Sequence, residues 1–159
     1  MGACALNKYG SKNKYGSKWT VVDGISFQSK WEAEYWQVLK VLEQDKLIDK
    51  LKRQLRYPLI VNGQKIGTSV IDFRFIELDE DGYPLRTRLQ DTKGFIGKDT
   101  NTQLWKIKHA IIKATTGLPV EIIQKKNFRG SYEEDQSLSA VDRRIHSQLA
   151  AMPKRNRSR

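Results

Sequence analysis

A chain of 159 residues, 38% of them hydrophobic, is long enough to bury a core as one domain with tails. Its one cysteine, Cys4, excludes an intrachain disulfide, and with only two histidines no Cys/His zinc cluster can form. No apolar run approaches the ~18 residues of a membrane span, and no signal peptide is visible. We therefore expect a cytoplasmic protein with no membrane partner.

The net charge of +11 is concentrated toward the two ends of the chain. Residues 1–18 carry four lysines and no acid, and residues 125–159 carry nine Lys/Arg against four acids. Residues 19–124 are nearly balanced, with sixteen bases and fourteen acids. We predict a basic flexible arm, a core domain and a basic C-terminal extension over these ranges. Basic ends indicate a polyanionic partner, above all nucleic acid, with solubility or an anionic membrane as the alternative.

The predicted arm contains a tandem repeat of the hexapeptide Asn-Lys-Tyr-Gly-Ser-Lys over residues 7–12 and 13–18. Two copies are too few for a solenoid, and the composition is polar and turn-rich. Its lysines could contact phosphates while its tyrosines stack on bases, or the repeat is a duplicated linker without a role. The predicted phosphate contacts are Lys8, Lys12, Lys14 and Lys18.

The core begins with a predicted hairpin and a helix. Residues 19–27 form a short hairpin around Asp23-Gly24, with Trp19, Val21, Ile25 and Phe27 available to the core. Ser29 is a good N-cap, and Glu32 three residues later completes a capping box. Apolar residues then recur at helical spacing, so we predict a helix that ends near residues 44–46.

Three strands follow. Residues 50–61 predict a strand interrupted near Pro58, and residues 66–78 and 85–95 predict the two arms of a hairpin. A two-residue loop at Asp81-Gly82 would pair Glu80 with Tyr83. That register places Asp72 directly opposite Asp91 and puts Lys93 on the same face. Because like charges opposite one another destabilise a sheet, we expect a divalent cation to offset the repulsion.

The remaining elements complete a mixed α/β core. A second helix is predicted over residues 102–116, with Leu104, Ile107, Ile111 and Ile112 largely on one side and Gly117 as its stop. Residues 118–124 form a short strand, and residues 139–152 form a C-terminal helix before a basic tail. The predicted core order is αβββαβ, which is a layered α/β arrangement.

Three segments, in order, carry a family resemblance. They are Phe-Gln-Ser-Lys-Trp-Glu-Ala-Glu-Tyr at 27–35, Ile-Asp-Phe at 71–73 and Gln-Asp-Thr-Lys-Gly-Phe at 90–95. An acid on a helix, an Asp on a strand and an acid-x-Lys on the next strand resemble the PD-(D/E)XK nuclease superfamily. More narrowly, residues 15–123 resemble small phage and prophage endonuclease-like proteins with a lysine-rich start. Ile71 stands where many superfamily members have a proline before the first acid.

This resemblance implies a restriction-endonuclease-like core, a mixed sheet flanked by helices. It also implies a Mg²⁺-dependent endonuclease, for which Mn²⁺ substitutes, acting on DNA in phage recombination or processing inside the bacterial host cell. Asp72, Asp91 and Glu32 would hold the metal, and Lys93 would lie near the attacking water. Glu34 is the alternative helix acid. Small proteins of this kind often cut branched DNA such as Holliday junctions as homodimers, so we expect that substrate and assembly.

Each assignment has a structural alternative. Asp91 and Lys93 could be an ordinary ion pair on a strand, and Glu32 could serve the capping box alone. Further predicted contacts to DNA phosphates, or else solvated cations, are Lys106, Arg143, Arg144, Lys154, Arg155 and Arg157. The alternative functions are a non-catalytic basic nucleic-acid-binding protein and a nuclease subunit of a larger recombination machine. The strand face with two acids and a lysine favours the nuclease over a pure binder. A protein that only binds DNA does not need these acids, because they repel phosphate when no metal is present.

Overall fold

A computed structural model describes residues 19–94, 100–125 and 138–152 of the chain. The predicted contacts Lys8, Lys12, Lys14, Lys18, Lys154, Arg155 and Arg157 lie outside these residues. The described elements are, in order, β1 (Thr20–Val22), β2 (Ile25–Phe27), α1 (Lys30–Gln44), β3 (Ile48–Val61), β4 (Gln64–Leu78), β5 (Pro84–Lys93), α2 (Thr100–Thr116), β6 (Val120–Gln124) and α3 (Ala140–Ala151). No helix among the described residues is long and apolar enough to cross a membrane.

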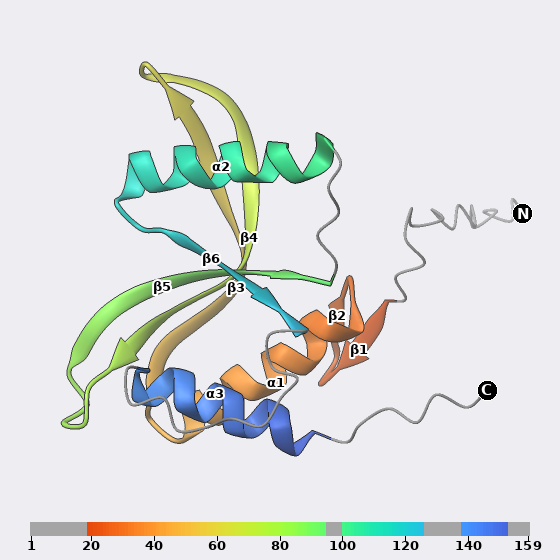
Figure 1. The fold of residues 1–159 in the computed structure, drawn as a ribbon, viewed down its shortest axis with the longest axis vertical. Coiled ribbons are helices and arrows are strands. Elements are labelled where there is room, and N and C mark those ends of the chain that lie inside the picture. The colour runs from red at the N-terminus through yellow and green to blue at the C-terminus, as the bar shows by residue number, and fades with distance from the viewer. Residues whose placement is uncertain (1–18, 95–99, 126–137, 153–159) are drawn as a thin grey trace, which may run out of the picture.

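The main sheet has four strands in the order β3-β4-β5-β6, and β1 and β2 form a separate hairpin. β3, β4 and β5 are antiparallel neighbours, whereas β6 returns parallel to β5 after the crossover through α2. Figure 1 shows α1 and α3 side by side at one end of the long β3–β4 ribbon, with α2 at the other end. The predicted mixed α/β class and the αβββαβ order are confirmed.

Helix α1 begins where the capping box predicts. Ser29 Oγ accepts a hydrogen bond from the Glu32 amide at 3.1 Å, and Glu32 Oε2 accepts one from the Gln28 amide at 3.2 Å. The predicted apolar face is buried, and it packs against Phe73 and Phe75 of β4 and against α3. The Glu32 carboxylate thus takes the amide before the N-cap in place of the Ser29 amide of a full capping box, and the two bonds fix Glu32 at the first turn of the helix, beside the sheet.

The β4–β5 hairpin has the predicted register but not the predicted turn. The ladder runs from Glu77 opposite Arg86 to Phe73 opposite Gln90. The two-residue loop is wrong, because the Asp79 side chain accepts the amides of Asp81 and Tyr83 and closes a longer loop. A shift of one residue between Glu77 and Leu78 brings the strands back to the predicted pairing.

Four predicted core positions are exposed instead. Trp19 and Val21 are more than half exposed, because each strand of the first hairpin has three residues and only Phe27 is fully buried. Leu104 and Ile107 are also more than half exposed, so α2 packs mainly through Ile112 near its C-terminal end. Pro58 does not interrupt β3, because β3 is an edge strand where a missing amide is tolerated.

The core is divided between two clusters that meet at the middle of β4. Phe73 packs with α1 and α3, whereas Ile71, two residues earlier, packs with Leu59, Leu89 and Ile112. Neighbouring residues of one face thus serve different cores, which requires strong local coiling of the strand. Asp72 lies between Ile71 and Phe73, at this junction. Opposite it, Gln54 of β3 has a left-handed backbone with φ of +53°.

Candidate functional site

Asp72 is the central acid at the junction. Its Oδ2 accepts hydrogen bonds from the Thr92 amide at 2.8 Å and the Thr92 hydroxyl at 2.7 Å. The paired residues of β4 and β5 end one step away, at Phe73 and Gln90. The side chain of Asp72 therefore takes a backbone donor of β5 just beyond the ladder, which ties the first acid to the strand that carries Asp91 and Lys93.

Asp91 is the more buried of the two predicted strand acids, at 3% exposure. Its Oδ2 lies 2.6 Å from Lys93 Nζ and 3.4 Å from Nε2 of His109 on α2. Lys93 is on the same side of β5, as predicted, and its side chain is 31% exposed. The arrangement leaves a lysine at the surface directly above a buried carboxylate.

Glu32 joins the site through Gln54. Gln54 Nε2 lies 2.8 Å from Glu32 Oε1 and 3.3 Å from Asp72 Oδ1, so one amide bridges the helix acid and the strand acid. Glu34, the alternative helix acid, instead pairs with Lys125 and with Lys30. Of the two candidates, the structure therefore places Glu32 at the site.

The electrostatics of the two strand acids diverge. Burial, followed by the Asp91 charge, raises the pKa of Asp72 to about 7 despite the Thr92 hydrogen bonds. Burial also acts to raise the pKa of Asp91, but His109 and Lys93 outweigh it and hold that pKa below its usual value. Burial raises the pKa of Glu32 as well. Crowded acids at different pKa values are frequent at functional sites, although structural networks also produce them.

The donor set suits a hard cation with few protein ligands. Among the described residues, no three His, Cys, Asp or Glu side chains form a group that could hold a metal ion. The candidate is therefore the pair Asp72 and Asp91, with Glu32 held behind Gln54. Mg²⁺ is commonly bound by one or two carboxylates and keeps several waters, so an oxygen pair of this kind fits it. Glu32, the third predicted ligand, is linked to Asp72 through Gln54.

Three site residues have no clear signal in the sequence. Gln54 and His109 contact the predicted acids, yet neither occurs in a motif, and Thr92 occurs only as the middle residue of acid-x-Lys. Nδ1 of His109 is buried and has no hydrogen-bond partner among the described residues, while the ring packs on Trp105. The strand of residues 48–61 also contains Asp49, Lys50, Lys52, Arg53 and Arg56, so the sequence does not single out Gln54.

The predicted DNA contacts that the structure describes are dispersed. Lys106 is exposed on α2 and lies over the Trp105 ring, 6.0 Å from its centroid. Arg143 is exposed on α3, whereas Arg144 is engaged with Asp45 at 2.8 Å and links α3 to the end of α1. Arg144 thus has a structural partner, and Lys106 and Arg143 remain open for contacts.

A family comparison covers most of the chain. The family model that matches spans residues 12–138 and is described as a protein of unknown function, DUF1064. The chain belongs to the DUF1064 family. Membership assigns no activity, and no curated protein and no solved structure matches the chain.

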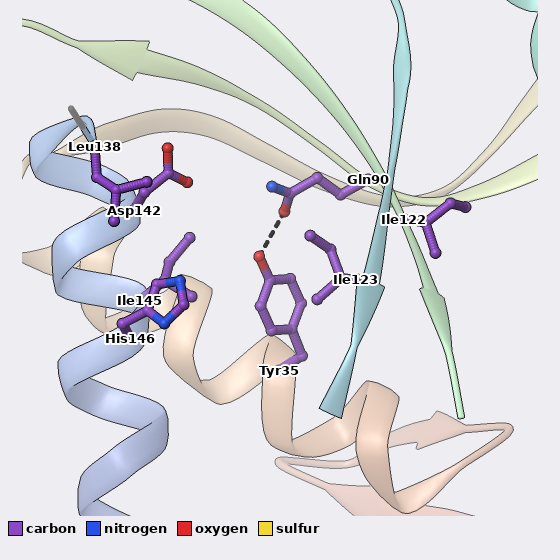
Figure 2. Close-up of a pocket in the computed structure, with 8 residues that line it drawn as sticks. All are labelled: Tyr35, Gln90, Ile122, Ile123, Leu138, Asp142, Ile145 and His146. Atoms are coloured by element: carbon purple, nitrogen blue, oxygen red, sulfur yellow. Dashed lines mark hydrogen bonds between the residues drawn. The ribbon is translucent and has the colours of Figure 1, made fainter. Parts of the chain in front are cut away.

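The opposite side of β5 carries a second polar network in this DUF1064 protein. Arg88 is buried and pairs with Glu77, Glu121 and Asp142. Figure 2 shows Tyr35 donating to Gln90 Oε1 at 2.7 Å beside a pocket of about 270 Å³ between α1, α3, β5 and β6. Tyr35, Gln90 and Asp142 are bonded to protein groups, so we interpret this network as structural. Gln90 faces away from Asp91, as predicted.

Proposed function

We propose that this protein is a Mg²⁺-dependent endonuclease of the PD-(D/E)XK type that hydrolyses DNA phosphodiester bonds. The observation that carries the proposal is the buried Asp91 with Lys93 Nζ at 2.6 Å, tied to Asp72 on the adjacent strand through Thr92. The site is costly for folding, because burial and the charge of Asp91 disfavour ionised Asp72 and burial disfavours ionised Glu32. A bound cation would offset that cost.

Each residue has a distinct role in this proposal. Asp72 and Asp91 would hold Mg²⁺, which when bound supplies a Lewis acid that polarises a phosphoryl oxygen. Lys93 is 31% exposed and can hold a water at Nζ or stabilise the negative charge that develops on the phosphate. Glu32, whether neutral or charged, accepts a hydrogen bond from Gln54, and through Gln54 it helps to hold Asp72 in place. His109 contacts Asp91 from the side of α2 and keeps that carboxylate directed toward Lys93.

The proposal is tested by DNA cleavage with Lys93→Ala. End-labelled four-way junction, duplex and single-stranded DNA are incubated with purified protein in Mg²⁺, in Mn²⁺ and in EDTA. We expect cuts that need the metal and are lost in Lys93→Ala while DNA binding is retained. Lys65→Ala, which removes an exposed lysine at the far end of β4, is the charge-matched control and should cut normally. Equal cutting by both variants would refute the role of Lys93.

The finer assignments rest on the same proposal. A restriction-endonuclease-like core is supported by the αβββαβ order with β6 parallel to β5. A preference for branched DNA, a homodimer with two active sites and a role in phage recombination are supported by the sequence resemblance. Cations in the terminal segments favour contacts with the backbone over base reading, which suits recognition of DNA structure. Cuts confined to the branch point would support this preference, and equal cutting of all three substrates would remove it.

The second candidate is a basic protein that binds nucleic acid without cleaving it. The net charge of +11, concentrated toward the two ends of the chain, favours it, because basic segments bind DNA phosphates without any cleavage. Such a protein would lose DNA affinity with salt but show no saturable Mg²⁺ site. Binding without cleavage, identical in wild type and Lys93→Ala, would establish it. A nuclease subunit of a larger machine would cleave only after its partner is added.

A further inference from the structure

Gln54 places one neutral side chain between two acids that lie on different elements. Its Nε2 lies 2.8 Å from Glu32 Oε1 on α1 and 3.3 Å from Asp72 Oδ1 on β4. An amide is a neutral donor, so it satisfies both carboxylates without adding a positive charge. A lysine or arginine here would neutralise the acids and compete with a cation. The amide therefore holds the acids in place and keeps the site negative.

The backbone of Gln54 is in a conformation that a residue with a side chain seldom adopts. Its φ of +53° lies in the left-handed region, inside a strand whose neighbours Arg53 and Leu55 still pair with Phe73 and Ile71. Glycine adopts this conformation without steric cost, whereas glutamine is strained there. Strained residues persist where the surroundings hold them, and they cluster at functional sites. The backbone alone assigns no role, because exposed Lys50 has the same φ; the two hydrogen bonds from the Gln54 amide to Glu32 and Asp72 indicate one.

Both oxygens of Asp72 have protein donors. Thr92 donates twice to Oδ2, and Gln54 donates to Oδ1, on the side of α1. Glu32 is fixed in the same way, with Oε2 on the Gln28 amide and Oε1 on Gln54. Removal of Gln54 would release one oxygen of each acid at once, while leaving their other hydrogen bonds intact.

We propose that Gln54 is a positioning residue that presets Asp72 for the cation by anchoring it to Glu32, and that its strained backbone is a cost of that role. The inference rests on the proposed function, because it assigns Gln54 to the same metal site. Partners that orient metal ligands typically change metal affinity or activity about 10–100-fold when they are removed. A purely structural glutamine would affect folding instead.

The test compares Gln54→Gly with Lys50→Gly. Glycine at 54 removes the amide and relieves the left-handed backbone. Lys50 has the same φ of +53° in the same strand, and its side chain is exposed. Lys50→Gly therefore relieves the same backbone strain but leaves the hydrogen bonds to Glu32 and Asp72 unchanged. Gln54→Asn is a second variant, because asparagine tolerates this backbone but is one methylene short of bridging both acids. Mg²⁺ is titrated into each full-length protein by calorimetry, and urea unfolding is measured in EDTA.

We expect both glycine variants to unfold at a urea midpoint equal to or above that of wild type. Gln54→Gly and Gln54→Asn should bind Mg²⁺ about 10–100-fold more weakly, with kcat lowered and KM for DNA unchanged. Lys50→Gly should bind Mg²⁺ as wild type does. Wild-type Mg²⁺ affinity in Gln54→Gly, or a large loss of stability in it, would overturn the inference and leave the nuclease proposal standing. A wild-type protein with no saturable Mg²⁺ site would overturn both.

Discussion

Replacing Asp72 by asparagine should stabilise the metal-free protein, and the gain should depend on pH. The pKa of Asp72 is raised from 3.8 to about 7, first by burial and then by the charge of Asp91. The folded state therefore binds this proton more tightly than the unfolded state does. Ionisation of Asp72 therefore destabilises the folded state. This loss of stability is absent well below pH 3.8, grows as the pH rises and reaches its full size above about pH 7.

The size of the effect follows from the shift. A rise of about three pKa units corresponds to about 4 kcal/mol, since each unit is worth about 1.4 kcal/mol. Asparagine keeps an oxygen that can accept the two Thr92 hydrogen bonds, but its amide nitrogen replaces the oxygen that accepts from Gln54, so about 4 kcal/mol is an upper bound on the gain. At about pH 8 in EDTA, Asp72→Asn should thus be more stable than wild type by up to about 4 kcal/mol. The difference should shrink toward zero as the pH falls to about 4.

Urea denaturation of both proteins at several pH values between these limits measures this difference. The pKa of His146 is lowered by burial, which costs both proteins stability in acid, and the comparison cancels that contribution. Saturating Mg²⁺ should reverse the order, because only wild type keeps both candidate ligands. A variant that is less stable than wild type at about pH 8, or a difference independent of pH, would refute the account of Asp72 as a buried, repelled acid.

Two further pairs of variants test the framework that supports the site. Arg88→Ala should cost about 3–5 kcal/mol in urea unfolding, because it removes the buried partner that Glu77, Glu121 and Asp142 share. Arg86→Ala removes an exposed partner of the same Glu77 and should cost less than about 1 kcal/mol, so equal losses would contradict this. Ser29→Ala should cost about 1 kcal/mol through the lost N-cap bond to Glu32. Ser29→Asp, which can still cap, should recover most of that loss, and failure to recover it would argue against capping.

Local patterns determined much of the fold. The capping box at Ser29 and Glu32, the apolar face of α1 and the glycine stop at Gly117 depend on residues within about one helical turn of each other. Their positions follow from the sequence because the interactions are short-range. The β4–β5 register also follows, even though the turn was mispredicted, since burying Phe73 and Phe75 on one face permits only one pairing parity. Asp72, Asp91 and Lys93 were therefore placed on their strands correctly.

The tertiary structure alone decided which other residues join the acids. Gln54 reaches Glu32 and Asp72 only because β3 coils where the two cores meet, and His109 reaches Asp91 only because the crossover sets α2 beside β5. The exposure of Trp19 and Leu104 likewise depends on which faces the other elements leave uncovered. Periodicity specifies that a face is apolar or charged, but not what lies against it. That depends on contacts between residues distant in sequence, and these are fixed when the sheet coils and the helices pack.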